Sequence, residues 1–176
     1  MLLNPELFSI TQSKEMGMWP PSDLVADSIY PYIKRMPNPV KILDVGVFKG
    51  ENVYRFLEKD EQKKIEMIYA VKTPYTNFNE NEHLDNLLDN NLKECYGKFV
   101  FSVPDEPVDI VCINSRADLT RSLNDYYKCV RKNGIFCGNN HAETHVKVAL
   151  SEFRRANKIG TPISVALDTW FWYVRG

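Results

Sequence analysis

The stretch that decides the fold is Ile42-Leu43-Asp44-Val45-Gly46-Val47-Phe48-Lys49-Gly50, an apolar run that ends in an acid and opens into a turn with two glycines. Gly46 permits a sharp turn where a Cβ would clash, and Gly50 lets the next segment start close to the strand end or to a ligand. Apolar residues then recur at helical spacing between Glu51 and Lys59. The stretch therefore predicts a strand, a tight turn and a helix, which is a nucleotide-binding geometry.

The spacing of the two glycines separates the classes of nucleotide site. A dinucleotide fingerprint has G-x-G-x-x-G, and a Walker loop has G-x-x-x-x-G-K followed by Ser or Thr. This chain has D-x-G-x-x-x-G followed by Glu51-Asn52 and fits neither pattern. It resembles motif I of the class I S-adenosylmethionine-dependent methyltransferases, a family in which this loop cradles the amino-acid part of the cofactor. The alternative is an α/β protein that binds nothing at this turn.

Length and composition favour one compact domain with a substantial core, because the chain has 176 residues. The net charge is −1, with no long basic or acidic block. We therefore expect a small-molecule substrate rather than nucleic acid or an anionic membrane. No signal peptide and no apolar run of roughly 18 residues is present, so we expect a soluble, cytoplasmic protein. The four cysteines form no C-x-x-C pair, which disfavours a zinc cluster.

We expect an irregular segment over residues 1–21, followed by a single domain over residues 22–176 in which strand and helix patterns alternate. We expect helices over residues 22–36, 51–59, 80–95, 119–133 and 146–153. We expect strands over residues 40–45, 65–71, 99–103, 108–113 and 135–138, and a closing hairpin of 163–167 with 170–174 across Asp168-Thr169. This order predicts a doubly wound, Rossmann-like, mostly parallel sheet with a C-terminal antiparallel hairpin.

The resemblance to the methyltransferase family extends over nearly the whole chain, from Ser22 to Val174. Residues 108–114 are similar to the family's fourth strand, and Arg131 to Gly138 resembles its "K-x-G-G" approach to the fifth strand. The closing run from Asp168 is similar to the last strand of small O-methyltransferase-like members. The resemblance implies a class I methyltransferase fold with S-adenosylmethionine as the cofactor. The cofactor-binding residues that it implies are Asp44, Gly46, Val47, Phe48, Gly50, Lys72 and Asn114.

Several positions depart from the family pattern. The second strand usually ends in an acid that accepts hydrogen bonds from both ribose hydroxyls, but here Lys72 follows it and cannot accept. Asn114 stands where many relatives carry an Asp, and Asn139 and Asn140 stand where metal-dependent members have acids. Asparagine lacks the charge that makes a Mg²⁺ site strong, so we expect a metal-independent mechanism and assign no metal ligand.

The acceptor is expected to contact Trp19, Arg116, Asn139 and Asn140. Trp19 lies in an apolar segment that can cover the substrate side in similar small methyltransferases, although an isolated Trp near a terminus more often packs on the core. For Lys72 and Arg116 the alternative to a ligand contact is a solvated strand end.

Methyl transfer requires mostly alignment of the acceptor and removal of its proton. His141 follows Asn139 and Asn140 at the carboxyl edge of the sheet, where open α/β folds place their sites. It is the candidate catalytic base, with His145 as a supporting residue. Alternatively, both histidines only flank the start of a helix. A two-histidine metal face is disfavoured, because the Glu of H-E-x-x-H and a third ligand are missing.

Three functions remain open at the level of sequence. The first is a metal-independent methyltransferase acting on a small hydroxylated or amino acceptor. The second is a protein with the methyltransferase fold and a binding or interaction role but no activity. The third is a nucleotide-sugar or nucleotide-dependent enzyme of another doubly wound class, in which Lys49, Lys72 or Arg116 pairs with phosphate. The sequence also leaves the oligomeric state open, a homo-oligomer included.

Overall fold

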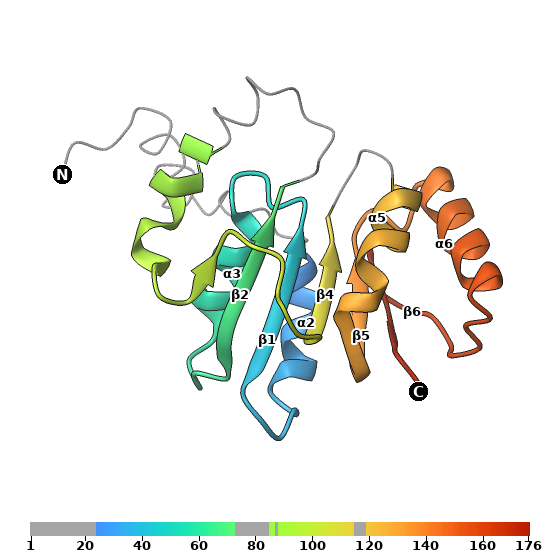
Figure 1. Ribbon diagram of the computed structural model, residues 1–176, viewed down its shortest axis with the longest axis horizontal. Coiled ribbons are helices and arrows are strands. Elements are labelled where there is room, and N and C mark those ends of the chain that lie inside the picture. The colour runs from blue at the N-terminus through green and yellow to red at the C-terminus, as the bar shows by residue number, and fades with distance from the viewer. Residues whose placement is uncertain (1–23, 73–84, 87, 115–118) are drawn as a thin grey trace.

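The computed structural model describes residues 24–72, 85, 86, 88–114 and 119–176. In this part of the chain the strands form one sheet in the order β3-β2-β1-β4-β5-β7-β6 (Figure 1). Their bounds are β1 Val40–Val45, β2 Ile65–Val71, β3 Phe99–Val100, β4 Val108–Ile113, β5 Val130–Gly138, β6 Ser164–Ala166 and β7 Thr169–Tyr173. The first five strands are parallel, β7 is antiparallel to β5, and β6 is antiparallel to β7. The predicted doubly wound, Rossmann-like fold with a C-terminal hairpin is confirmed.

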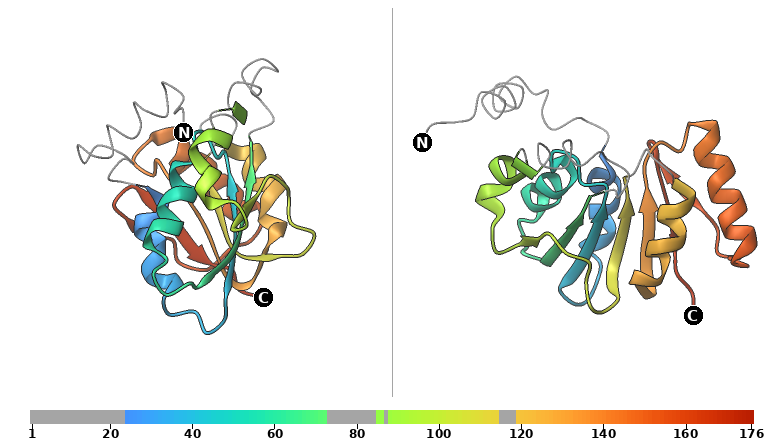
Figure 2. Two further views of the ribbon diagram at one scale, coloured as in Figure 1. Left: turned by 90° about the vertical axis from the view of Figure 1, so that its left-hand side faces the viewer. Right: turned by 45° about the horizontal axis from the view of Figure 1, so that its top comes forward.

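Helices cover both faces of the sheet (Figure 2). Their bounds are α2 Val25–Ile33, α3 Glu51–Lys59, α5 Leu119–Tyr126 and α6 Thr144–Ala156, and residues 88–92 are also helical. Side chains alternate between the two faces of a strand. Along β1, Ile42 therefore packs in the core that contains α2 and α3, whereas Leu43 packs in the core that contains α5 and α6. The sheet is therefore packed against helices on both of its faces.

The predicted end of the helix before β5 and the predicted start of β5 are both wrong, and the conformation of Asn133 explains both errors. Asn133 and Gly134 were expected to end a helix, but α5 ends at Tyr126 and β5 already begins at Val130. Asn133 does have a positive φ, of 61°, which a helix end would need. Here that φ lies within β5, in the region where the β4–β5 register shifts. The left-handed residue therefore marks an irregularity in a strand.

Other boundaries differ by a few residues. β3 has two residues where five were predicted. The hairpin turn is Leu167-Asp168, one residue earlier than predicted, and Leu167 has a φ of 56°. The first described helix ends at Ile33 rather than at Met36. The predicted segment over residues 1–21, the N-cap Ser22 and the start of the helix at residue 80 lie outside the described residues.

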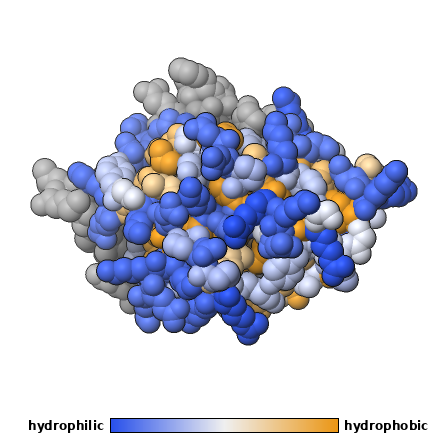
Figure 3. Space-filling model, turned by 60° about the horizontal axis from the view of Figure 1, so that its bottom comes forward, coloured by the Kyte–Doolittle hydropathy of each residue, from blue (hydrophilic) through white to orange (hydrophobic). Residues whose placement is uncertain are grey.

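The end of the molecule where the parallel strands begin is mainly hydrophilic, with smaller apolar areas between polar side chains (Figure 3). None of the helices in the described part of the chain has the length and apolar character of a membrane span.

Candidate functional site

Four predicted site residues form one row at the carboxyl edge of the sheet. Register partners at the ends of β2, β1, β4 and β5 are Val71, Val45, Ile113 and Gly138. The next residues along these strands are Lys72, Gly46, Asn114 and Asn139. They lie at the end marked by the arrowheads in Figure 1, where α/β sheets bind ligands.

The turn between β1 and α3 has the left-handed conformations that the two glycines predicted. The φ angle is 81° at Gly46 and 83° at Gly50. The Gly46 N–H donates to the carbonyl oxygen of Val71 (2.8 Å), which ties the turn to β2, and the Gly50 N–H donates to that of Val47 (2.8 Å). A Cβ on Gly50 would lie 2.7 Å from Leu92 Cδ1, so glycine is also required there for space.

Phe48 is an unusual residue at the centre of this turn. Its φ is 49°, a left-handed conformation that is uncommon for residues other than glycine. Its side chain is 43% exposed, so burial of the ring does not account for the conformation. Such strain costs of the order of 1 kcal/mol and tends to concentrate at functional sites.

Asp44 lies beneath the turn as a buried acid with one carboxylate oxygen that accepts no hydrogen bond from the described residues. Its side chain is fully buried, and its Oδ1 accepts hydrogen bonds from the amides of Asn52 (3.2 Å) and Asn114. Its Oδ2 has no hydrogen-bond partner among the described residues. Burial raises the pKa of Asp44 to about 7, although both asparagine amides act in the opposite direction. A buried acid in this state can accept a positively charged donor from a ligand.

Asn52 belongs to the site, and the sequence reasoning missed it. Its Oδ1 accepts a hydrogen bond from the Ala26 N–H (2.8 Å), so this one side chain links α2, α3 and β1. In the sequence, Asn52 could have been recognised as a polar residue on the face of the helix that Val53 and Phe56 predict to be buried. Next to it, burial raises the pKa of Glu51 as well.

Lys72 does not stand alone at the end of β2. Its Nζ lies 2.5 Å from Asp85 Oδ1, and both side chains are partly exposed. Sequence reasoning named Glu80 and Glu82 as possible substitutes for the ribose acid, and both lie outside the described residues. It did not name Asp85. The ion pair is close to the surface and contributes little to stability. It does bring a carboxylate to the strand end that lacks the family's ribose acid.

Hydrogen bonds to backbone and side-chain groups of the β6–β7 hairpin hold the loop between β5 and α6. The His141 N–H donates to the carbonyl oxygen of Asp168 (3.1 Å), and the Ala142 N–H donates to the Asp168 side chain (2.8 Å). The indole of Trp170 donates to the carbonyl oxygen of Asn139 (3.0 Å). Asp168 thus positions the loop of the candidate base, a role that the sequence did not indicate.

The remaining predicted side chains are less constrained. Asn140 has a φ of 57°, and the His141 side chain is half-buried. His145 is largely exposed, and its Nε2 lies 3.3 Å from Glu143 Oε2. Trp19 and Arg116 lie outside the described residues. Within the described ranges, no three His, Cys, Asp or Glu side chains are grouped so that they could hold a metal ion.

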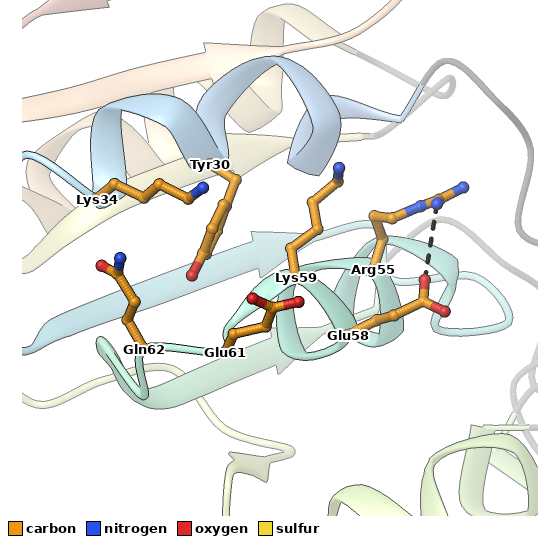
Figure 4. Close-up of a pocket in the computed structure, with 7 residues that line it drawn as sticks. All are labelled: Tyr30, Lys34, Arg55, Glu58, Lys59, Glu61 and Gln62. Atoms are coloured by element: carbon orange, nitrogen blue, oxygen red, sulfur yellow. Dashed lines mark ion pairs between the residues drawn. The ribbon is translucent and has the colours of Figure 1, made fainter.

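A separate groove of about 430 Å³ lies between α2 and α3 (Figure 4). It is near the C-terminal ends of these helices, away from the Gly46–Gly50 turn. Its lysine and arginine at α3 are already paired: Lys59 Nζ lies 3.1 Å from Asp27, and Arg55 contacts Glu58 at 3.6 Å. The groove therefore belongs to an ion-pair network that joins the two helices.

Comparison by sequence finds no matching family model and no curated relative. Comparison by structure finds a candidate caffeoyl-CoA O-methyltransferase from Staphylococcus aureus, with 16% identity and a TM-score of 0.64 over 98% of this chain and 93% of that one. A SAM-dependent O-methyltransferase from Thermotoga maritima has 12% identity and a TM-score of 0.63 over 93% and 70%. A candidate RNA methyltransferase from Pyrococcus horikoshii has 18% identity and a TM-score of 0.61 over 85% and 79%. The chain therefore shares the fold of these methyltransferases, and identities this low show the fold alone.

Proposed function

We propose that this protein is a metal-independent S-adenosylmethionine-dependent methyltransferase that acts on a small hydroxylated or amino acceptor. One observation carries the proposal: a left-handed glycine turn stands over a fully buried aspartate whose Oδ2 lacks a partner among the described residues. The cofactor's amino-acid part carries an ammonium group, which is the donor that such an oxygen lacks. The residues at the end of β1 therefore fit this cofactor.

The following residues would then bind the cofactor. Asp44 Oδ2 would accept a hydrogen bond from the ammonium group, and the turn from Gly46 to Gly50, with Val47 and Phe48, would lie against the cofactor. Asn114 stays fixed through its bond to Asp44. When bound, the cofactor supplies a methyl group that its sulfonium already activates. The protein has only to place the acceptor in line and receive its proton.

We assign the binding and the deprotonation of the acceptor to the residues that follow the carboxyl end of β5. His141 would take the proton from the acceptor's hydroxyl or amino group, and the amides of Asn139 and Asn140 would orient the acceptor. Trp19 and Arg116 are proposed as further acceptor contacts. A small acceptor fits the net charge of −1, because an RNA substrate needs many phosphate-neutralising side chains. We also propose that the enzyme is cytoplasmic, as expected in the analysis of the sequence.

Calorimetric titration of the purified protein tests the function. We expect S-adenosylmethionine and S-adenosylhomocysteine to bind, and NAD and ATP not to bind. Preferential binding of ATP or NAD would favour a nucleotide-dependent enzyme of another doubly wound class. Absence of binding by all four compounds would favour an interaction role for the fold.

The His141→Ala variant should lose turnover with cofactor binding unchanged. Removal of a general base lowers kcat by roughly 10²–10⁴-fold. His145→Ala is the informative comparison: if its exposed imidazole, which lies 3.3 Å from Glu143, supports His141, kcat falls less than in His141→Ala, and if it only flanks the helix start, kcat is unaltered. Steady-state kinetics with and without EDTA measure both points, and activity should survive chelation. Loss of turnover in EDTA with recovery on adding Mg²⁺ would reject the metal-free mechanism.

The Lys72→Asp variant should bind S-adenosylhomocysteine about tenfold more tightly, because a charge-assisted hydrogen bond to a ribose hydroxyl contributes roughly 1.5–3 kcal/mol. Asp85→Asn is the informative comparison. If Asp85 already serves as the ribose acceptor beside Lys72, Asp85→Asn weakens binding and Lys72→Asp gains little. Calorimetry on both variants separates these cases, and unchanged affinity in both would show that no ribose lies at the end of β2.

A further inference from the structure

The amide of Asn52 is shared between the buried acid and a neighbouring helix. The Asn52 side chain is only 6% exposed. Its Nδ2 donates to Asp44 Oδ1 (3.2 Å), and its Oδ1 accepts from the Ala26 N–H (2.8 Å). A backbone N–H can only donate and an ionised carboxylate can only accept, so these two partners fix which way round the amide lies. Asn52 is therefore held in one orientation between β1 and α2.

The bond to Ala26 caps α2 from another helix. Ala26 lies in the first turn of α2, where backbone N–H groups have no acceptor within the helix itself. The residue at the N-cap position of α2 is Leu24, whose side chain cannot accept a hydrogen bond. Asn52 on α3 supplies the acceptor instead. The first turn of α2 thus depends on the position of a side chain that also contacts Asp44.

The bond to Asp44 holds the carboxylate by one of its oxygens. Oδ1 accepts from Asn52 on α3 and from Asn114 just after β4, which leaves Oδ2 for a further donor. Burial raises the pKa of Asp44, and the Asn52 amide opposes that rise because it stabilises the ionised form. An ammonium group binds to the ionised form. Asn52 therefore favours the state of Asp44 that binds a cation.

Two other titratable groups act on this acid in the described part of the chain. Glu51 on α3 raises the pKa of Asp44 through its charge. Cys112 on β4 is buried beside Asp44 and Asn52; burial raises the pKa of its thiol, and the Asn52 amide opposes this rise too. Without that amide the thiol would still be uncharged at neutral pH. Asp44 is therefore the group whose titration Asn52 controls.

We propose that Asn52 is a positioning residue for the ammonium group of the cofactor, and that it couples occupancy of Asp44 Oδ2 to the start of α2. The inference rests on the proposed function, because it takes the cofactor's amino group as the donor to Oδ2. A charged donor there would keep Asp44 ionised, and an ionised acceptor strengthens the bond from Asn52 Nδ2. Hydrogen bonds in series strengthen one another, so the bond from Ala26 to Asn52 Oδ1 would tighten as well.

Two ligands separate positioning from a structural role: S-adenosylhomocysteine, and 5′-methylthioadenosine, which lacks the amino-acid part. By calorimetry at about pH 7.5, Asn52→Ala should bind S-adenosylhomocysteine about tenfold more weakly, because the donor that holds the charged acceptor is lost. Its affinity for 5′-methylthioadenosine should not change. Ser28→Ala is the matched control: it removes a hydrogen bond from α2 to the carbonyl oxygen of Ala166 (3.1 Å) and should leave both affinities unaltered.

The outcomes distinguish this inference from the proposed function. If the parent protein binds both compounds and Asn52→Ala weakens both equally, Asn52 is a structural residue only. Unchanged affinity for S-adenosylhomocysteine in a folded Asn52→Ala would likewise overturn the inference, and in both cases the proposed function stands. A parent protein that binds neither compound rejects the proposed function, and the inference falls with it.

The pH dependence of S-adenosylhomocysteine affinity gives a second readout. In the parent protein the affinity should weaken below about pH 7, as Asp44 takes up a proton. In Asn52→Ala the midpoint should move up by about one pH unit, because a donor to the ionised form is lost. Glu51→Gln should move it down, since the charge of Glu51 raises the pKa of Asp44. Equal midpoints in Asn52→Ala and the parent protein would contradict the role of Asn52.

Hydrogen exchange at the Ala26 N–H, followed by NMR, tests the coupling to α2 in the unmodified protein. S-adenosylhomocysteine should slow exchange at this amide several-fold, and 5′-methylthioadenosine should not, because only the first compound carries the amino group. The measurement needs no substitution, so it decides the question even if Asn52→Ala does not fold. Exchange at Ala26 that responds equally to both compounds, or to neither, would reject the coupling.

Discussion

The Asp44→Asn variant is expected to be more stable than the parent protein above pH 7 and to bind S-adenosylhomocysteine more weakly. The two effects have one cause. Asp44 is fully buried, and its Oδ2 has no partner among the described residues, so ionising it in the folded protein is costly. A ligand with a positively charged amino group would relieve that cost.

The sign of the pH dependence follows from proton binding. An aspartate in the unfolded chain loses its proton near pH 4, whereas folded Asp44 keeps its proton up to about pH 7. Between these values the folded state binds more protons, so raising the pH lowers the free energy of unfolding. The free energy of unfolding falls by about 4 kcal/mol in total, and this decrease is complete only above pH 7.

Asparagine removes this loss, because it does not ionise. It keeps an oxygen for the amides of Asn52 and Asn114, but its own amide takes the place of Oδ2 and lacks a partner, which costs about 1–3 kcal/mol. The net gain in stability above pH 7 is therefore about 1–3 kcal/mol, and it should vanish or reverse at pH 5. Denaturant unfolding of both proteins at pH 5 and pH 8 measures the difference.

Asp109→Asn is the matched control, since Asp109 is also a buried acid on the sheet. It accepts a hydrogen bond from the Lys41 N–H (2.7 Å) and pairs with Arg131. Loss of its charge should destabilise the protein, and S-adenosylhomocysteine binding should not change. Destabilisation by both variants at pH 8 would show that Asp44 is an ordinary structural acid.

Cofactor affinity should fall about 10- to 100-fold in Asp44→Asn, because a charge-assisted hydrogen bond is lost. In the parent protein, affinity should also weaken as the pH falls below about 7 and Asp44 becomes protonated. The variant should lack this pH dependence. Calorimetry between pH 6 and pH 8 tests the point, and equal affinities throughout would place the ammonium group elsewhere.

The second large effect is expected from Gly46→Val. A β-branched residue at a φ of 81° is strained by about 1–3 kcal/mol. The turn would relax to a negative φ and break the hydrogen bond of residue 46 to Val71. Binding would then have to restore the strained turn, so S-adenosylhomocysteine affinity should fall by roughly tenfold or more.

Gly160→Val separates this effect from a general cost of replacing glycine. Nothing lies within 4 Å of a Cβ placed at Gly160, and its φ is outside the left-handed region. This variant should bind like the parent protein. Calorimetry and thermal unfolding of both variants give the comparison, and parent-like affinity in a folded Gly46→Val would remove the cofactor from this turn.

Local sequence determined most of the fold and the conformation of the turn at the candidate site. The apolar runs over β1, β2 and β4, and the helix between Glu51 and Lys59, have the residues predicted for them. The glycines at 46 and 50 placed the turn correctly, because a positive φ and a crowded Cβ are constraints that one residue type satisfies. Boundaries went wrong near Asn133 and Leu167, where a left-handed residue lies in a strand irregularity and in a hairpin turn, respectively.

Hydrogen bonds and ion pairs between residues distant along the chain could be identified only from the tertiary structure. Asn52 and Asn114 reach Asp44 from a helix and a neighbouring strand, Asp85 pairs with Lys72, and Asp168 holds the His141 loop. Hydrophobic periodicity reports which face of an element is buried, whereas these contacts depend on which elements the sheet order makes neighbours. The missing partner of Asp44 Oδ2 is of the same kind, because a side chain can be recognised as unsatisfied only when everything around it is in place.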